Sequence, residues 1–210
     1  MGTFPVSREA LHAVFGPQAF ALGLFYAHQP ALRFELSLGG DRLDQFEQAW
    51  DRGRGIVDTA FGDAPALVAV VSWFSRGPML RHREVFRSLR ACGVRPGRPR
   101  AAWTEPYVDP GVDPDLDGPE TRAFAAFFVE RQAVHRLLWG ALAVDLGIRP
   151  RLEASLYLAD PERGVLVHPY DDRGMDVIGP DRARLAELYG RFNDRLLDWD
   201  RERMDAFFAA

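Results

Sequence analysis

The chain has 210 residues, a formal net charge of −4 and a single cysteine, Cys92. Its content of 47% hydrophobic and 27% charged residues is that of a folded globular chain and not of a disordered one. All 26 basic residues are arginine, which excludes a Schiff-base lysine, a Walker-A lysine and the strand lysine of a protein kinase. Because one cysteine cannot form an internal disulfide and no targeting or membrane-spanning segment is recognisable, we expect a cytoplasmic protein with no membrane partner.

Helical and strand patterns alternate along the first half of the chain. Residues 1–30 predict two short helices, and residues 41–62 predict a longer helix that begins at an Asp41 cap. Between them, residues 31–38 alternate strictly between apolar and polar side chains, which predicts a half-buried strand. We expect the buried face of this strand to consist of Leu32, Phe34, Leu36 and Leu38. The valine-rich run at 66–74 predicts a strand covered on both faces, near the centre of the sheet.

The second half begins with a helix predicted at 78–91. Residues 95–119 contain six prolines and three glycines, which predicts an irregular segment. An aromatic strand at 121–130 and a helix at 134–146 follow, and the last long helix covers 181–197. Before that helix we expect an antiparallel meander of three strands over residues 152–159, 164–170 and 175–178.

These patterns predict one α+β domain over residues 1–210. Its sheet should be mixed or mostly antiparallel, with about six strands and with helices packed on it. The irregular segment at about 95–119 would then be a loop of this domain and not a linker between two domains.

The tightest polar cluster in the sequence holds three carboxylates and an imidazole within nine residues. The candidate catalytic residues in it are His168, Asp171, Asp172, Arg173 and Asp176. One interpretation is an acid/base or divalent-metal site, with Arg33 and Arg173 holding an anionic substrate. The other, which we favour, is a hairpin turn in which aspartate accepts hydrogen bonds from backbone amides and glycine permits the bend. Since the histidines also lack the spacing of zinc ligands, we expect no metal and no cofactor.

Short motifs are distributed over nearly the whole chain. They are His168-Pro-Tyr-Asp-Asp-Arg-Gly-Met-Asp-Val-Ile, Leu188-Tyr, Phe192-Asn-Asp, Leu197-Asp-Trp-Asp-Arg, Leu32-Arg-Phe-Glu-Leu, and Leu138-Trp-Gly-Ala with Asp145. In these motifs the chain resembles a bacterial family described as domain of unknown function 3885. The resemblance implies an α+β domain and implies no particular activity.

Charge is segregated along the middle of the chain. Residues 76–100 hold eight arginines against Glu84 alone, whereas residues 104–120 hold six acidic residues and no basic one. One interpretation is that the two segments neutralise each other across the surface. The sharper hypothesis is that the acidic segment docks onto a basic partner protein, as in an immunity-type or adaptor protein without catalytic activity. The candidate binding residues are Trp103, Tyr107, Asp113, Asp115, Asp117, Arg33 and Glu35.

Nucleic-acid binding through the arginine-rich segment is a third possibility. The acidic residues that follow directly in the sequence would repel phosphates, so we expect a protein partner and no nucleic acid.

Overall fold

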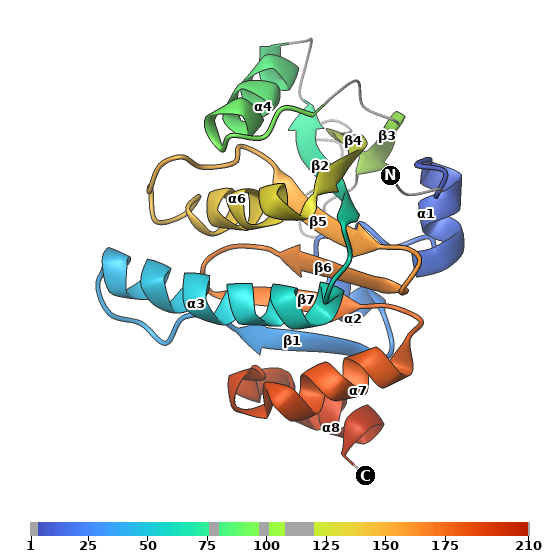
Figure 1. The fold of residues 1–210 in the computed structure, drawn as a ribbon, viewed down its shortest axis with the longest axis vertical. Coiled ribbons are helices and arrows are strands. Elements are labelled where there is room, and N and C mark those ends of the chain that lie inside the picture. Colours follow the sequence, from blue (N-terminus) through green and yellow to red (C-terminus); the bar gives the residue numbers. More distant parts are fainter. Residues whose placement is uncertain (1–3, 76–79, 97–100, 108–119, 210) are drawn as a thin grey trace.

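Seven strands form one antiparallel sheet in the part of the chain that the structure describes (Figure 1). This computed structural model describes residues 4–75, 80–96, 101–107 and 120–209. In spatial order the strands are β1 (Ala31–Glu35), β7 (Gly174–Ile178), β6 (Val165–Pro169), β5 (Ser155–Asp160), β2 (Ala66–Ser75), β4 (Glu120–Glu130) and β3 (Ala101–Tyr107). The predicted α+β class and the closing meander of β5, β6 and β7 are confirmed, with one strand more than the six expected.

Helices cover both faces of this sheet. In Figure 1, α3 and α6 cross the front face, α4 lies at the top, and α7 and α8 lie beyond the β1 edge. The rear face is covered by α1, which contacts β3, and by α2, which contacts β1 and β7. The helices are α1 (Arg8–Phe15), α2 (Leu24–Ala27), α3 (Arg42–Phe61), α4 (Leu80–Ala91), α6 (Arg131–Leu142), α7 (Arg182–Arg191) and α8 (Arg201–Phe208). No helix among the described residues has both the length and the apolar character needed to cross a membrane.

Local sequence signals set the helix ends that were predicted most clearly. The carboxylate of Asp41 accepts hydrogen bonds from the backbone N–H groups of Leu43 and Asp44, which caps α3 as expected. Gly16 ends α1 with a φ of +86°, a backbone conformation that side chains with a Cβ rarely adopt. The same residue separates the two short helices expected in the first 30 residues.

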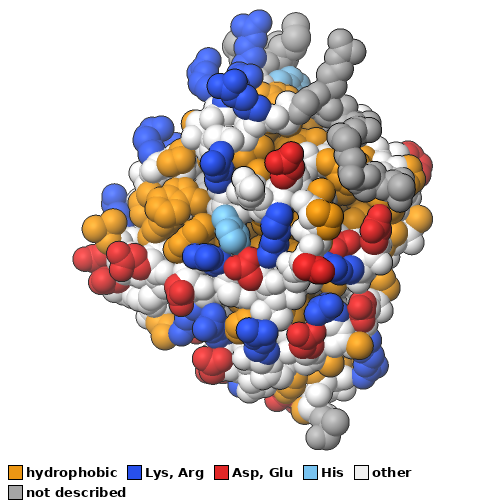
Figure 2. Space-filling model, in the orientation of Figure 1, with side chains coloured by type: hydrophobic (Ala, Val, Ile, Leu, Met, Phe, Trp, Pro, Cys, Tyr) orange, Lys and Arg blue, Asp and Glu red, His pale blue; other side chains and the backbone are white. Residues whose placement is uncertain are grey.

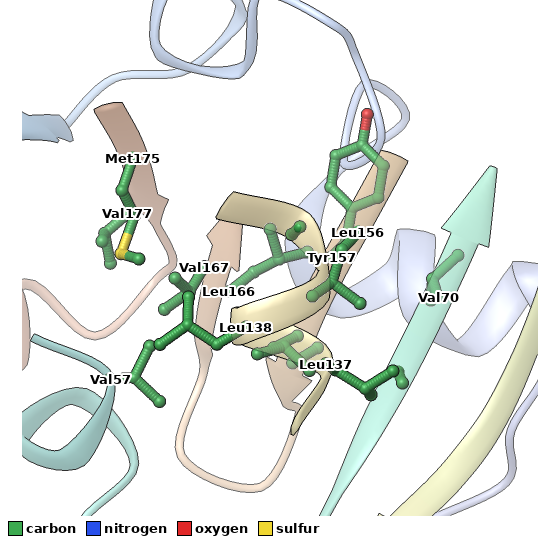
Figure 3. Close-up of a cluster of buried hydrophobic side chains, with 14 of the residues drawn as sticks. Val57, Val70, Leu137, Leu138, Leu156, Tyr157, Leu166, Val167, Met175 and Val177 are labelled. Carbon is green, nitrogen blue, oxygen red and sulfur yellow. The ribbon is translucent and has the colours of Figure 1, made fainter. Parts of the chain in front are cut away.

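The main apolar core lies between the sheet and the front helices. Figure 3 shows Val57 of α3 and Leu138 of α6 near Val167 of β6, with Leu137 of α6 on the side nearer to Val70 of β2. All five of these side chains are fully buried. Burying each stabilises the fold by roughly 1.5–3 kcal/mol relative to an exposed side chain, so this layer holds α3 and α6 against the sheet.

Two predictions for loops and strand faces were wrong. Residues 101–107 form the edge strand β3 and not an irregular segment. An edge strand tolerates Pro106 because a residue there can leave its amide position unpaired, which is why the proline content misled the prediction. Leu38 is 65% exposed, because β1 ends at Glu35 and the chain has left the sheet by that point.

Two predicted helices are shorter than their patterns suggested. Helix α6 ends at Leu142, and α7 ends at Arg191 before two short 3-10 turns (Asn193–Arg195 and Asp198–Asp200). The apolar residues after α7 serve another purpose, since the backbone N–H of Leu197 donates to the carbonyl of Arg33 at 2.9 Å and Leu196 bridges Phe34. This segment therefore covers the free edge of β1.

Candidate functional site

The link between β6 and β7 is a tight hairpin turn. Asp171 accepts a hydrogen bond from the backbone N–H of Arg173 at 2.8 Å and forms an ion pair with the guanidinium of the same residue. The backbone N–H of Tyr170 donates to the carbonyl of Gly174 at 3.2 Å. Asp172 is also buried, and burial together with the charge of Asp171 raises its pKa. The Asp171 carboxylate thus stabilises a chain reversal, which is what aspartate commonly does in turns.

Asp176 lies on β7, where it contacts groups other than those of the turn. Its fully buried carboxylate accepts hydrogen bonds from the Arg33 guanidinium at 2.7 and 3.0 Å and from the backbone N–H of Phe25 at 3.0 Å. The strand register places Arg33 on one side of Asp176 and His168 on the other. Burial by itself lowers the pKa of Arg33, but the hydrogen bonds and charge of Asp176 raise that pKa above its ordinary value, so the guanidinium stays charged.

Asp200 joins this pair from the carboxyl-terminal part of the chain. Its carboxylate lies 3.5 Å from the Arg33 guanidinium and accepts a hydrogen bond from the Tyr26 phenol at 3.1 Å. The same guanidinium lies 4.6 Å from the centre of the Tyr26 ring. We call Arg33, Asp176, Asp200 and Tyr26 the ion cluster. It ties α2 and the segment before α8 to the sheet edge formed by β1 and β7.

His168 is a buried, neutral imidazole beside the ion cluster. Its Nδ1 lies 2.8 Å from the carbonyl oxygen of Leu156, and since a carbonyl only accepts, Nδ1 carries the proton. Its ring stacks on Tyr157 with 4.2 Å between the ring centroids. Burial lowers the pKa of His168 below its ordinary value of 6.5.

Lowering the pH from 7 to 5 is expected to destabilise the protein through His168. Because the pKa of His168 is lower in the folded than in the unfolded chain, the unfolded chain takes up the proton first, and stability falls as the pH drops below about 6.5. One such proton gives a slope of at most about 1.4 kcal/mol per pH unit. Urea unfolding at pH 7 and at pH 5 measures this change in the free energy of unfolding. His168→Gln should show a shallower pH dependence than the wild type, so equal slopes for the two proteins would contradict the assignment.

The structure divides the predicted catalytic residues between two places. Asp171 and Arg173 bind each other at the turn, whereas His168 and Asp176 lie on adjacent strands beside Arg33. Among residues 4–75, 80–96, 101–107 and 120–209, no three histidine, cysteine, aspartate or glutamate side chains are grouped so that they could hold a metal ion. The cluster that is compact in the sequence is therefore not one convergent site in space.

The predicted binding residues lie in several places. Trp103 and Tyr107 are half-buried on β3, where Trp103 stacks on Phe124 with 5.0 Å between centroids and Tyr107 lies 4.9 Å from Phe74. Glu35 ends β1, half-buried and opposite Gly174. The three aspartates of the acidic segment, Asp113, Asp115 and Asp117, lie outside the described residues. The two rings are thus packed on the sheet and are only partly exposed.

A different aromatic surface lies where α3 meets α6. Leu43, Phe46 and Trp50 follow one stripe of α3, and Trp139 of α6 packs against it. The ring of Trp139 lies 4.5 Å from Phe46 and 5.4 Å from Trp50, measured between centroids. Leu43 is 66% exposed, and both tryptophans are half-buried. We call these four residues the tryptophan face. In Figure 2, hydrophobic side chains gather between the left-hand ends of α3 and α6.

Cys92 is an inert thiol. It is buried, and burial raises its pKa to about 11, so that the sulfur stays protonated at neutral pH.

Sequence reasoning missed Tyr26, Asp200 and the tryptophan face. Asp200 and Tyr26 are 174 residues apart in the chain, so no local pattern could pair them. A signal was nevertheless present, because Asp200 lies within the motif Leu197-Asp-Trp-Asp-Arg and Trp139 within Leu138-Trp-Gly-Ala.

The fold and these contacts define an α+β domain with one antiparallel sheet, a self-paired ion cluster at one sheet edge and an aromatic surface on the front helices. The family model for a domain of unknown function (DUF3885) matches residues 8–200. Since this match spans most of the 210 residues, the chain belongs to that family. No curated protein matches the chain significantly. No solved structure does so either.

Proposed function

We propose that this chain is a bacterial, cytoplasmic protein-binding module of the immunity or adaptor kind, and that it captures a basic partner protein without catalysing a reaction. The observation that carries the proposal is the tryptophan face. Tryptophan is enriched among the residues that contribute most to binding energy in protein interfaces. Two half-buried tryptophans beside an exposed leucine give a partner a firm apolar surface to cover, because their rings are already fixed by contacts with one another and with Phe46.

Charge at the amino-terminal end of α3, on one side of this face, favours a basic partner. The stretch from Asp41 to Asp51 carries four exposed carboxylates, those of Asp41, Asp44, Glu47 and Asp51, against one exposed arginine, Arg42. In Figure 2, acidic side chains border the hydrophobic group at the left-hand end of α3. A basic partner surface would therefore be attracted to this end of the tryptophan face, and the paired charges would fix its orientation.

The alternative, a metal-dependent or acid/base enzyme at the Tyr170–Gly174 turn, has weaker support. Catalysis there would need Asp171, Asp172 and His168 to act on one substrate atom. Instead, the Asp171 carboxylate binds the turn itself, and the imidazole of His168 binds a backbone carbonyl. These contacts favour a structural role for the turn.

Binding can be tested with a synthetic amphipathic helix of leucine, tryptophan and lysine, and a matched peptide in which glutamate replaces lysine. Fluorescence anisotropy should show that the lysine peptide binds the protein more tightly than the glutamate peptide. Trp139→Ala and Leu43→Ala should each weaken binding of the lysine peptide, with about a tenfold loss for Trp139→Ala. Glu47→Gln combined with Asp51→Asn should flatten the salt dependence of binding.

Trp199→Ala is the matched control, because Trp199 is 88% exposed and lies outside the tryptophan face. The Trp199→Ala variant should bind the lysine peptide with the affinity of the wild type. Leu43→Ala guards against a folding artefact, since a side chain so exposed contributes little to the core. Equal affinity for the two peptides, or wild-type binding by both Trp139→Ala and Leu43→Ala, would overturn the proposal.

A further inference from the structure

A groove of about 650 Å³ lies between α4 and the segment that leads into β5. Helix α4 contributes Glu84, Arg87, Ser88 and Ala91, and the other wall consists of Arg149, Pro150, Arg151 and Glu153. Its volume falls within the range of roughly 300–1,000 Å³ that is typical of small-molecule sites. None of these residues belongs to the ion cluster or to the tryptophan face.

Two of the three guanidinium groups in this groove are free to bind an anion. Arg151 donates to the Glu153 carboxylate at 2.8 Å, but Arg87 and Arg149 form no ion pair with any residue that the structure describes. Arg83 and Arg90 are also exposed and lie four residues before and three residues after Arg87 on the same helix. Figure 2 shows basic side chains gathered at the top of the molecule, over α4. A planar guanidinium binds a phosphate through two parallel hydrogen bonds, so this arrangement suits a phosphate group.

An aromatic pocket of about 370 Å³ adjoins the groove and shares Glu84 and Glu153 with it. Its walls combine apolar and aromatic side chains, among them Trp73, Phe74, Val85, Val144, Leu152 and Tyr170, with the polar side chains of Ser72, Ser155 and the two shared glutamates. A ligand that spans the two would place a charged group between arginines and a flat or apolar group beside aromatic rings. The groove therefore supplies charged groups and the pocket supplies aromatic and apolar side chains to one ligand.

We propose that this groove and pocket together bind a small organic phosphate, with its phosphate between Arg87 and Arg149 and its apolar or aromatic part in the pocket. The carboxylates of Glu84 and Glu153 limit the charge that the site accepts, because they would repel additional phosphates. That limit favours a ligand with one phosphate group over the continuous backbone of a nucleic acid. The inference stands independently of the protein-binding proposal, since the two use different surfaces.

Isothermal titration calorimetry with four probes tests the site: adenosine monophosphate, adenosine, inorganic phosphate and a single-stranded oligonucleotide. Adenosine monophosphate should bind more tightly than adenosine or inorganic phosphate. The double substitution Arg87→Gln and Arg149→Gln should weaken binding of adenosine monophosphate at least about tenfold and remove its advantage over adenosine. Val144→Phe, which narrows the pocket, should make adenosine monophosphate bind no more tightly than inorganic phosphate.

Arg191→Gln, a substitution of an exposed arginine on α7 at the opposite end of the molecule, is the control and should bind like the wild type. The Arg87→Gln and Arg149→Gln double variant and the Arg191→Gln variant should both keep the wild-type midpoint of thermal unfolding, which separates loss of binding from loss of folding. The proposal is overturned if adenosine monophosphate gives no binding heat at millimolar concentration, or if the double variant binds it as the wild type does. Tighter binding of the oligonucleotide than of adenosine monophosphate would also overturn it and would indicate a nucleic-acid surface.

Discussion

Replacing Asp176 with alanine is expected to lower the free energy of unfolding by about 3–5 kcal/mol, because it leaves the Arg33 guanidinium without its main partner in a buried place. The carboxylate of Asp176 receives two hydrogen bonds from Arg33 and one from the backbone of Phe25, and all of these are lost together. Asp200, at 3.5 Å, is the weaker partner and compensates only in part. Chemical denaturation with circular dichroism measures the loss.

A double substitution separates the cost of an unpaired charge from the cost of a cavity. Arg33→Met combined with Asp176→Leu removes both charges and fills the space, so it should recover most of the lost stability. As a control for position, Arg8→Gln breaks a surface ion pair with Glu105 and should cost less than about 1 kcal/mol. A cost for Asp176→Ala no larger than for Arg8→Gln would show that the ion cluster does not hold the sheet edge together.

Gly174→Ala is the second substitution with a large expected effect, at roughly 3 kcal/mol. A Cβ at this position would lie 1.8 Å from the Tyr170 phenol oxygen and 2.9 Å from the backbone carbonyl oxygen of Phe34. Tyr170 would have to leave its place against Arg33, and β1 and β7 would have to separate locally. Thermal and urea unfolding of the variant measure the effect.

Gly190→Ala is the matched control for this substitution. Gly190 lies in α7 with open space around the position of its Cβ, so alanine there should leave stability unchanged or raise it by up to about 1 kcal/mol. Combining Gly174→Ala with Tyr170→Ala should cost less than the sum of the two single substitutions, since the main clash is relieved. Additive costs would show that the phenol does not confine Gly174.

Much of the fold could be predicted because its elements have clear local patterns. The alternation of Leu32, Phe34 and Leu36 and the run of valines in β2 each report burial on a strand directly. The strand β3 could not be found in this way, because Pro106 and the surrounding prolines indicate a loop unless the strand is known to lie at an edge. The exposure of Leu43 could not be predicted either, since the helical spacing of apolar residues does not show where the layer that covers them ends.

The site was harder to predict than the fold. The turn role of Asp171 follows from local chemistry and was expected from the sequence. The pairing of Asp176 with Arg33 was not, because these residues are 143 positions apart and meet only when β7 lies beside β1. Alternation assigned Asp176 to a strand but could not name the neighbouring strand. The tryptophan face likewise depends on how α3 and α6 pack, which their separate patterns do not specify.

Amide chemical-shift mapping during titration with the lysine-rich amphipathic peptide is the most direct test of where this protein binds its partner. We predict that the largest shifts fall on α3 and α6 around Leu43, Trp50 and Trp139, while the amides of residues 168–176 stay close to their free positions. Shifts concentrated at the Tyr170–Gly174 turn, with α3 and α6 unaffected, would contradict the account and return the aspartate cluster to the centre of the function.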